Sequence, residues 1–95
     1  MAGFVVVDVT VTDDAAYQEY ARQVPPTVSA YDGEYVMRGG KVDAVEGDWQ
    51  PERFVVIRFP SVARAHQWHD SPEYAPLIPL RHASAITHMI IVEGV

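Results

Sequence analysis

FVVVDVTV, residues 4–11, is a run of β-branched and apolar side chains of the kind that forms a buried strand. Side chains point alternately to the two faces of a strand, so the odd-numbered valines share one face. Phe4 and Val6 then occupy the opposite face. We therefore expect a strand that is apolar on both of its faces.

A second run of this kind, FVVIRF, occupies residues 54–59. It places Phe54 and Val56 on one face and Val55 and Ile57 on the other. We expect it to be a central strand of the same sheet.

Capping residues, prolines and glycines predict the other elements. A helix follows Asp13, and Pro25 and Pro26 kink or break it. A strand at residues 34–40, with a bulge or bend at Gly39–Gly40, leads into an extended arm at residues 41–52. After the central strand come a helix from Ser61 to about His69, a shorter helix that restarts at Pro72, and a strand at residues 87–94.

The resulting order, βαββαβ, is the ferredoxin-like arrangement of class α+β. It predicts a single domain over residues 1–95, with an antiparallel sheet and both helices on one face. The second apolar face, which includes Phe4, Val6, Phe54 and Val56, would then be bare. A bare apolar patch of roughly several hundred Å² is more than monomers usually expose. We therefore expect a homodimer in which a second copy of the sheet covers this face.

Composition narrows the choice of partners. The chain has a net charge of −6 and no run of Lys or Arg, so neither nucleic acid nor a membrane surface is an expected partner. It contains no cysteine, which excludes thiolate chemistry and disulfides. The apolar N-terminal run lacks the basic flank of a signal peptide, so we expect a cytoplasmic protein. No phosphate loop, dinucleotide fingerprint or nucleophile constellation is present, and no cofactor is expected.

Several short motifs occur in a characteristic order. They are RGG at residues 38–40, EG.W at 46–49, FPS at 59–61, W.DSPEY at 68–74 and VEG at 92–94. Together they resemble the family known as domain of unknown function 1330, over almost the whole chain. The resemblance implies a dimeric α/β barrel, in which two ferredoxin-like sheets pack face to face. Relatives by fold include cofactor-free monooxygenases, polyketide cyclases and chlorite dismutase-like haem proteins, but function does not transfer at the level of fold alone.

The segment HQWHDSPEY, residues 66–74, has the appearance of a metal site. His66 and His69 are three residues apart and could share one ion on a helix. The familiar zinc helix instead has its histidines four apart with a Glu between them, and no third or fourth ligand is evident here. We read the segment as a helix end followed by a capped turn, and we predict no metal.

Arg38 has two interpretations, which the sequence does not separate. It lies before two glycines whose missing side chains would let a ligand approach, and an Arg there can hold a carboxylate or phosphate. It could equally form a salt bridge to Glu34, to Glu46 or to a carboxylate of a partner subunit.

Polar residues also interrupt the two apolar strands. Asp8 and Arg58 fall on the face expected to be bare. Because buried charges rarely stay unpaired, we expect the two residues to form an ion pair, within or between subunits, rather than a site for a polar ligand. Tyr35 and His88 are read as lying on facing strands, where they could form an acid–base pair. Trp49 is read as an anchor of the arm at the interface, or as part of a cleft.

The leading functional hypothesis is a cofactor-independent enzyme acting on a small anionic or aromatic metabolite. Its pocket would lie between the helices and the sheet, near the dimer interface, closed by the arm. Arg38 would bind an anionic group, and His69 with Tyr74 or Glu73 would move protons. The other side chains expected to contact the ligand are Tyr35, Trp49 and Trp68. The alternative is a non-catalytic small-molecule binding or stress-related accessory protein, so whether the chain is an enzyme stays open.

Overall fold

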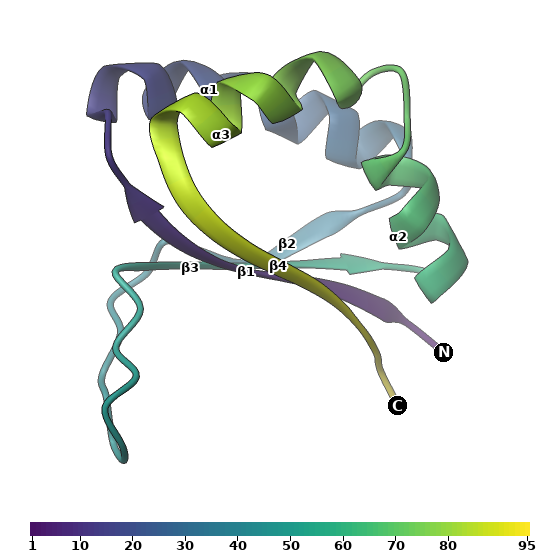
Figure 1. The fold of residues 1–95 in the computed structure, drawn as a ribbon. Coiled ribbons are helices and arrows are strands. Elements are labelled where there is room, and N and C mark those ends of the chain that lie inside the picture. The colour runs from purple at the N-terminus through teal and green to yellow at the C-terminus, as the bar shows by residue number, and fades with distance from the viewer.

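A computed structural model describes residues 1–95. Its elements are β1 (Gly3–Val11), α1 (Asp14–Ala30), β2 (Glu34–Arg38), β3 (Arg53–Phe59), α2 (Val62–His69), the 3-10 helix η1 (Ala75–Leu77), α3 (Ile78–Ser84) and β4 (Ala85–Glu93). The helices all lie on one side of the sheet (Figure 1). The predicted α+β, ferredoxin-like βαββαβ fold is confirmed.

The four strands form one antiparallel sheet in the order β2-β3-β1-β4. β1 lies between β3 and β4, and Val5 is paired with both Ile57 and Ile91. The two most apolar runs of the sequence are thus the two central strands, because a central strand has neighbours that bury it on both sides.

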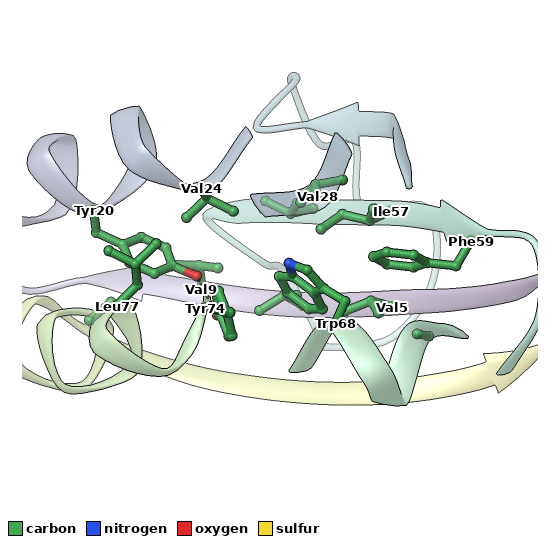
Figure 2. Close-up of a cluster of buried hydrophobic side chains, with 14 of the residues drawn as sticks. Val5, Val9, Tyr20, Val24, Val28, Ile57, Phe59, Trp68, Tyr74 and Leu77 are labelled. Atoms are coloured by element: carbon green, nitrogen blue, oxygen red, sulfur yellow. Dashed lines mark hydrogen bonds between the residues drawn. The ribbon is translucent and has the colours of Figure 1, made fainter. Parts of the chain in front are cut away.

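The core lies between the sheet and the helices. Val5 and Val9 point toward the helices and are almost fully buried. Trp68 of α2 stacks on Tyr74, with ring centroids 4.2 Å apart. Figure 2 shows Tyr20 at one end of this layer and Phe59 at the other, with Trp68 between them.

The opposite sheet face carries no helix, as the sequence predicted. The four residues expected to be bare on it are not fully exposed, however, because Val56 is buried and Phe4, Val6 and Phe54 are half-buried. Ile86 and Ile90 of β4 are 60% and 58% exposed on it.

The arm, residues 41–52, follows β2 and the two glycines and extends on the same side as this open face (Figure 1). Trp49 of the arm donates from its indole nitrogen to an Asp8 carboxylate oxygen at 2.8 Å. Its ring meets the ring of Phe54 edge-on, at a centroid distance of 5.8 Å.

Helix α1 is continuous, which corrects the predicted kink or break at Pro25 and Pro26. Pro25 has no N–H to donate to the carbonyl of Ala21, four residues earlier. Arg38 donates to this same carbonyl from Nη2, at 2.6 Å. A side chain from β2 therefore replaces the backbone hydrogen bond that the proline removes.

Two further details differ from the prediction. The helical stretch after α2 begins at Ala75, not at Pro72, because Ser71 caps a turn by accepting from the backbone N–H of Tyr74 at 3.1 Å. The predicted bend lies at Gly39, which has a positive φ, while a further irregularity that was not predicted lies in β2 at Val36, between Tyr35 and Met37.

The strand order corrects one predicted pair, and the strand register excludes the other within the chain, while a pair between subunits stays a prediction. Tyr35 and His88 belong to β2 and β4, which are the opposite edges of the sheet, so they are not neighbours. Asp8 and Arg58 do not pair within the chain: Asp8 accepts from the indole of Trp49, and Arg58 pairs with a carboxylate on β2 at 3.7 Å.

No helix is both long and apolar enough to cross a membrane.

Candidate functional site

A cavity of about 30 Å³ lies between α1, α3 and the sheet. This volume holds one or two water-sized groups. Its lining is mostly apolar, and it includes the tyrosines Tyr17, Tyr20 and Tyr35 and the ring of Trp68. Aromatic residues with a polar tip are suited to a small ligand that is part apolar and part polar.

Three arginines, Arg38, Arg53 and Arg81, also line the cavity. None of the three forms a salt bridge, whereas the other three arginines of the chain each pair with a carboxylate. The chain has 13 acidic residues, so carboxylates are not scarce. Three guanidinium groups without a carboxylate therefore converge on one apolar cavity.

Arg81 is the most deeply placed of these, with only 6% of its surface exposed. It points inward because α3 presents Arg81 and Ser84, three residues apart, to the core. Its Nη1 donates to the hydroxyl of Tyr74 at 2.6 Å, while its buried Nε has no hydrogen-bond partner in the chain. A buried donor without an acceptor is costly and requires an explanation.

Tyr74 is shared between Arg81 and a second phenol. The hydroxyl oxygens of Tyr20 and Tyr74 are 2.6 Å apart. Burial raises the pKa of Tyr20, and the nearby Tyr74 raises that pKa further. Tyr20 therefore stays protonated, and the inner end of the cavity is rich in hydrogen-bond donors.

Arg53 and Arg38 stand at the mouth. Arg53 lies over the ring of Tyr17 at 5.3 Å, and its buried Nε also lacks a partner in the chain. Arg38 lies over the ring of Tyr35 at 4.9 Å. Burial raises the pKa of Tyr35 to about 12, so this phenol is neutral at physiological pH.

A surface hollow of about 580 Å³ lies outside the mouth, beside α1. Its lining shares Ala21, Arg38 and Arg53 with the enclosed cavity. The two arginines therefore stand between the outer hollow and the buried site, where an entering anion would meet them.

The structure brings together part of the predicted site. Arg38, Tyr35 and Trp68 line the cavity, and Tyr74 reaches its inner end through Arg81. The indole nitrogen of Trp68 is used elsewhere, because it donates to the hydroxyl of Thr27 at 3.1 Å.

The remaining predicted residues lie outside the cavity. The ring of His69 contacts Tyr74 with centroids 5.9 Å apart, but its Nδ1 faces the carboxylate of Asp70 at 3.4 Å. Glu73 accepts from the hydroxyl of Tyr31 at 2.8 Å on the surface. Trp49 is on the opposite side of the sheet, in a hollow of about 560 Å³ between the arm and the open face.

Sequence reasoning missed Arg53, Arg81, Tyr17 and Tyr20. Arg53 has the odd-numbered parity of Val55 in β3, which places it on the helix-facing side. That signal was available. The two tyrosines lie three residues apart on one side of α1, a spacing that is equally typical of a core-facing helix, and nothing in the sequence pattern shows which side of α3 carries Arg81 to the core.

No three His, Asp or Glu side chains are grouped closely enough to hold a metal ion. His66 and His82 are both exposed. The absence of a bound metal stays a prediction, to be checked by elemental analysis of untagged protein.

Comparison with known proteins assigns the family. The model described as Domain of unknown function (DUF1330) matches residues 2–95, and the chain belongs to this family. No curated protein matches the chain.

Solved structures with the same fold include a protein of unknown function from Rhodopseudomonas palustris, RPA0582, with 19% identity and a TM-score of 0.81 over 99% of this chain and 82% of that one. SnoaB, a cofactor-independent oxygenase from Streptomyces nogalater, has 12% identity and a TM-score of 0.65 over 99% and 92%. A dabb family protein with a ferredoxin-like fold from Mesorhizobium loti has 11% identity and a TM-score of 0.67 over 99% and 97%. At these identities the likeness shows the fold alone.

Proposed function

We propose that this member of the DUF1330 family is a homodimer in which each subunit binds a small anionic metabolite in the arginine-lined cavity and acts on it without a cofactor. The observation that carries the proposal is Arg81, a buried guanidinium with no carboxylate partner and an unpaired Nε. Proteins rarely keep such a charge uncompensated, because its desolvation is costly. An anionic ligand would supply the missing partner.

The outer hollow and the enclosed cavity suggest how such a ligand would lie. The hollow has the volume of a small-molecule site, and the cavity adds an enclosed end with aromatic walls. The mouth arginines, Arg38 and Arg53, would attract and orient the anion. A ligand with an acidic group and an apolar or aromatic body matches this lining.

Proton transfer is the chemistry that the inner end supports best. A phenol that is hydrogen-bonded to a second phenol and to a guanidinium can pass a proton or stabilise a developing oxyanion. Tyr74 occupies this position, between Tyr20 and Arg81. The name of SnoaB, a cofactor-independent oxygenase, supports the idea that this fold hosts such chemistry, although only by analogy of fold.

The alternative is a binding protein without catalysis. The small volume of the cavity favours a binding protein, because most of the ligand would lie in the outer hollow, in contact with water, whereas catalytic sites commonly exclude water. The same arginines would bind the anion, but no phenol would need to exchange a proton.

The dimer would use the other side of the sheet. The open face exposes Ile86 and Ile90, and the arm extends beyond this face where a second copy would sit (Figure 1). Trp49 holds the base of the arm to Asp8 and Phe54, so the arm is directed toward a partner rather than back onto its own helices. The likeness to a dabb family protein with a ferredoxin-like fold supports this assembly, because the family resemblance implies a dimeric α/β barrel.

A thermal-shift screen of small metabolites against the purified protein tests the proposal. Each hit is then incubated with the protein and analysed by mass spectrometry. Hits should be carboxylates or other anions, and their effect should be lost in Arg53→Gln but kept in Arg64→Gln, which removes a surface guanidinium paired with Asp32. Conversion of a hit supports the enzyme, and recovery of every hit unchanged supports the binding protein. Hits that stabilise Arg53→Gln as well as the wild type would contradict the site.

A further inference from the structure

We propose that the inner end of the cavity, which Arg81 and Tyr20 line and Tyr74 supports by hydrogen bonds to both, is an oxyanion pocket that receives the carboxylate of the metabolite. The inference rests on the proposed function, and it names the group of the ligand that lies deepest and the residues that recognise it. Three steps lead to it: a count of hydrogens, the size of the cavity, and the energetic cost of the ligand-free state.

The count of hydrogens shows an excess of donors. Tyr20 and Tyr74 have two phenolic hydrogens, but a single hydrogen bond links their oxygens. The oxygen of Tyr74 also accepts from Arg81, which has no acceptor to offer in return. One phenolic hydrogen and the Nε–H of Arg81 are therefore left without an acceptor in the chain.

The ligand atom that fits these donors is an oxygen that carries no hydrogen. An alcohol or ammonium group would bring further donors to a site that already has too many. A water molecule could accept the hydrogen bonds but would leave the charge of Arg81 uncompensated. A carboxylate both accepts the hydrogen bonds and neutralises the charge.

The size of the cavity fixes the orientation. A volume of about 30 Å³ admits one or two oxygens but no aromatic ring. The carboxylate would therefore enter first, and the body of the ligand would remain toward the mouth, beside Arg53 and the rings of Tyr17 and Tyr35.

The ligand-free protein should be less stable than a variant without the charge of Arg81. A buried charge without a counter-charge lowers stability, and such sites are retained for binding rather than for folding. Arg81→Met keeps a long, flexible side chain of similar reach and removes the charge. The variant should therefore melt at the same temperature as the ligand-free wild type or higher, while losing the response to carboxylates.

The experiment compares benzoate with benzamide, which have the same ring but differ in charge at the head group. Thermal unfolding and titration calorimetry are performed at pH 7 on the full chain, on Arg81→Met and on Tyr20→Phe, with Arg64→Gln as the control. Benzoate should stabilise the wild type and the control, and benzamide should not. Arg81→Met should bind benzoate about tenfold more weakly or worse, because it loses the charged donor. Tyr20→Phe should bind it severalfold more weakly, because it loses the phenol of this pair that lines the cavity.

Equal binding of the two probes by the wild type, or no binding of benzoate, would overturn the inference. So would unchanged benzoate affinity in Arg81→Met, especially with a melting temperature several degrees lower, which would assign Arg81 to the fold. If Arg81→Met does not fold, Tyr20→Phe decides, since it removes a single hydroxyl. If metabolites from the screen need both Arg53 and Arg81 but bind equally well to Tyr20→Phe, the proposed function stands and the oxyanion pocket falls.

Discussion

Gly39, directly after β2, has a φ of +74°, a backbone conformation that glycine adopts without strain. A Cβ placed there would lie 2.5 Å from Nη1 of Arg53. The missing side chain of Gly39 thus leaves the space that the guanidinium of Arg53 occupies at the mouth of the cavity. A single residue fixes both a backbone turn and the position of a candidate ligand-binding group.

Replacing Gly39 should therefore affect both stability and binding. Gly39→Ala should lower the free energy of unfolding by about 1 kcal/mol, through its positive φ, and weaken metabolite binding by displacing Arg53. Gly47→Ala is the matched control, because Gly47 has a φ of +80° but nothing within 4 Å of its added Cβ. Urea unfolding and calorimetry measure the two effects. The role given to Gly39 would be wrong if the two variants bound the metabolite equally well.

Tyr35 makes the stability of the protein depend on alkaline pH. Its folded-state pKa of about 12 is above the value of about 10 for an unfolded tyrosine, because burial disfavours the phenolate. Its stabilising contribution is complete below pH 10 and is lost as the pH rises from 10 to 12. Urea unfolding between pH 8 and 11.5, taken at intervals of about half a unit, should show this decline, and Tyr35→Phe should make it shallower. A decline of the same slope in both proteins would contradict the assignment to Tyr35.

At this scale the sequence predicted some of the site and missed the rest for identifiable reasons. Arg38 was found because the two glycines that follow it indicate an accessible strand end. Tyr35 was chosen for a pairing with His88 that does not occur, and it shares the cavity with Arg38 because β2 is irregular between Tyr35 and Met37.

Arg81 was missed because the prediction has one short helix from Pro72, whereas the chain forms a turn, then η1 from Ala75 and then α3 from Ile78. The way these pieces join decides which side of α3 packs on the sheet, and the sequence pattern does not show it.

Among the elements, α1 depends on β2 for one of its hydrogen bonds. The sequence predicted a kink or break at Pro25–Pro26 because a proline inside a helix removes a backbone hydrogen bond. The helix stays continuous, and the carbonyl freed at Ala21 is bound by Arg38 from β2. The sequence around the two prolines does not show that the helix continues, because the side chain that binds the freed carbonyl is 17 residues away from it. The prolines thereby hold an arginine at the mouth of the cavity.

Pro25→Ala should separate the two roles of this contact. The new N–H can donate to the carbonyl of Ala21, so Arg38 loses its acceptor and becomes free to move. We expect a helix at least as stable as in the wild type and severalfold weaker metabolite binding. Thermal unfolding and calorimetry measure the two quantities.

Pro26→Ala is the control for this substitution. It restores an N–H toward the carbonyl of Arg22, which Arg38 does not contact, so its binding should equal that of the wild type. Metabolite affinity reduced equally by the two alanine substitutions would show that the helix as a whole, and not the Arg38 contact, governs the site.

At the scale of the whole molecule, we infer that one face of the sheet binds the ligand and the other forms the dimer. One face and its helices enclose the arginine-lined cavity, and the other face, with the arm, is left for a second copy (Figure 1). The apolar residues on both faces of β1 and β3 predicted the fold correctly, because one face needs helices and the other needs a further cover. They could not predict the cavity, which depends on side chains from α1, β2, β3 and α3 meeting in three dimensions.

Whether the chain forms a dimer decides which side of the sheet is free to bind a ligand. Sedimentation velocity of the purified chain at low micromolar concentration tests it most directly. We expect a single species of twice the 10.6 kDa chain mass, and a shift toward folded monomer in Ile90→Asp, which puts a charge on the exposed apolar surface that a partner would cover. A folded wild-type species of 10.6 kDa would contradict it, because the open face and the hollow under the arm would then also be available to a ligand.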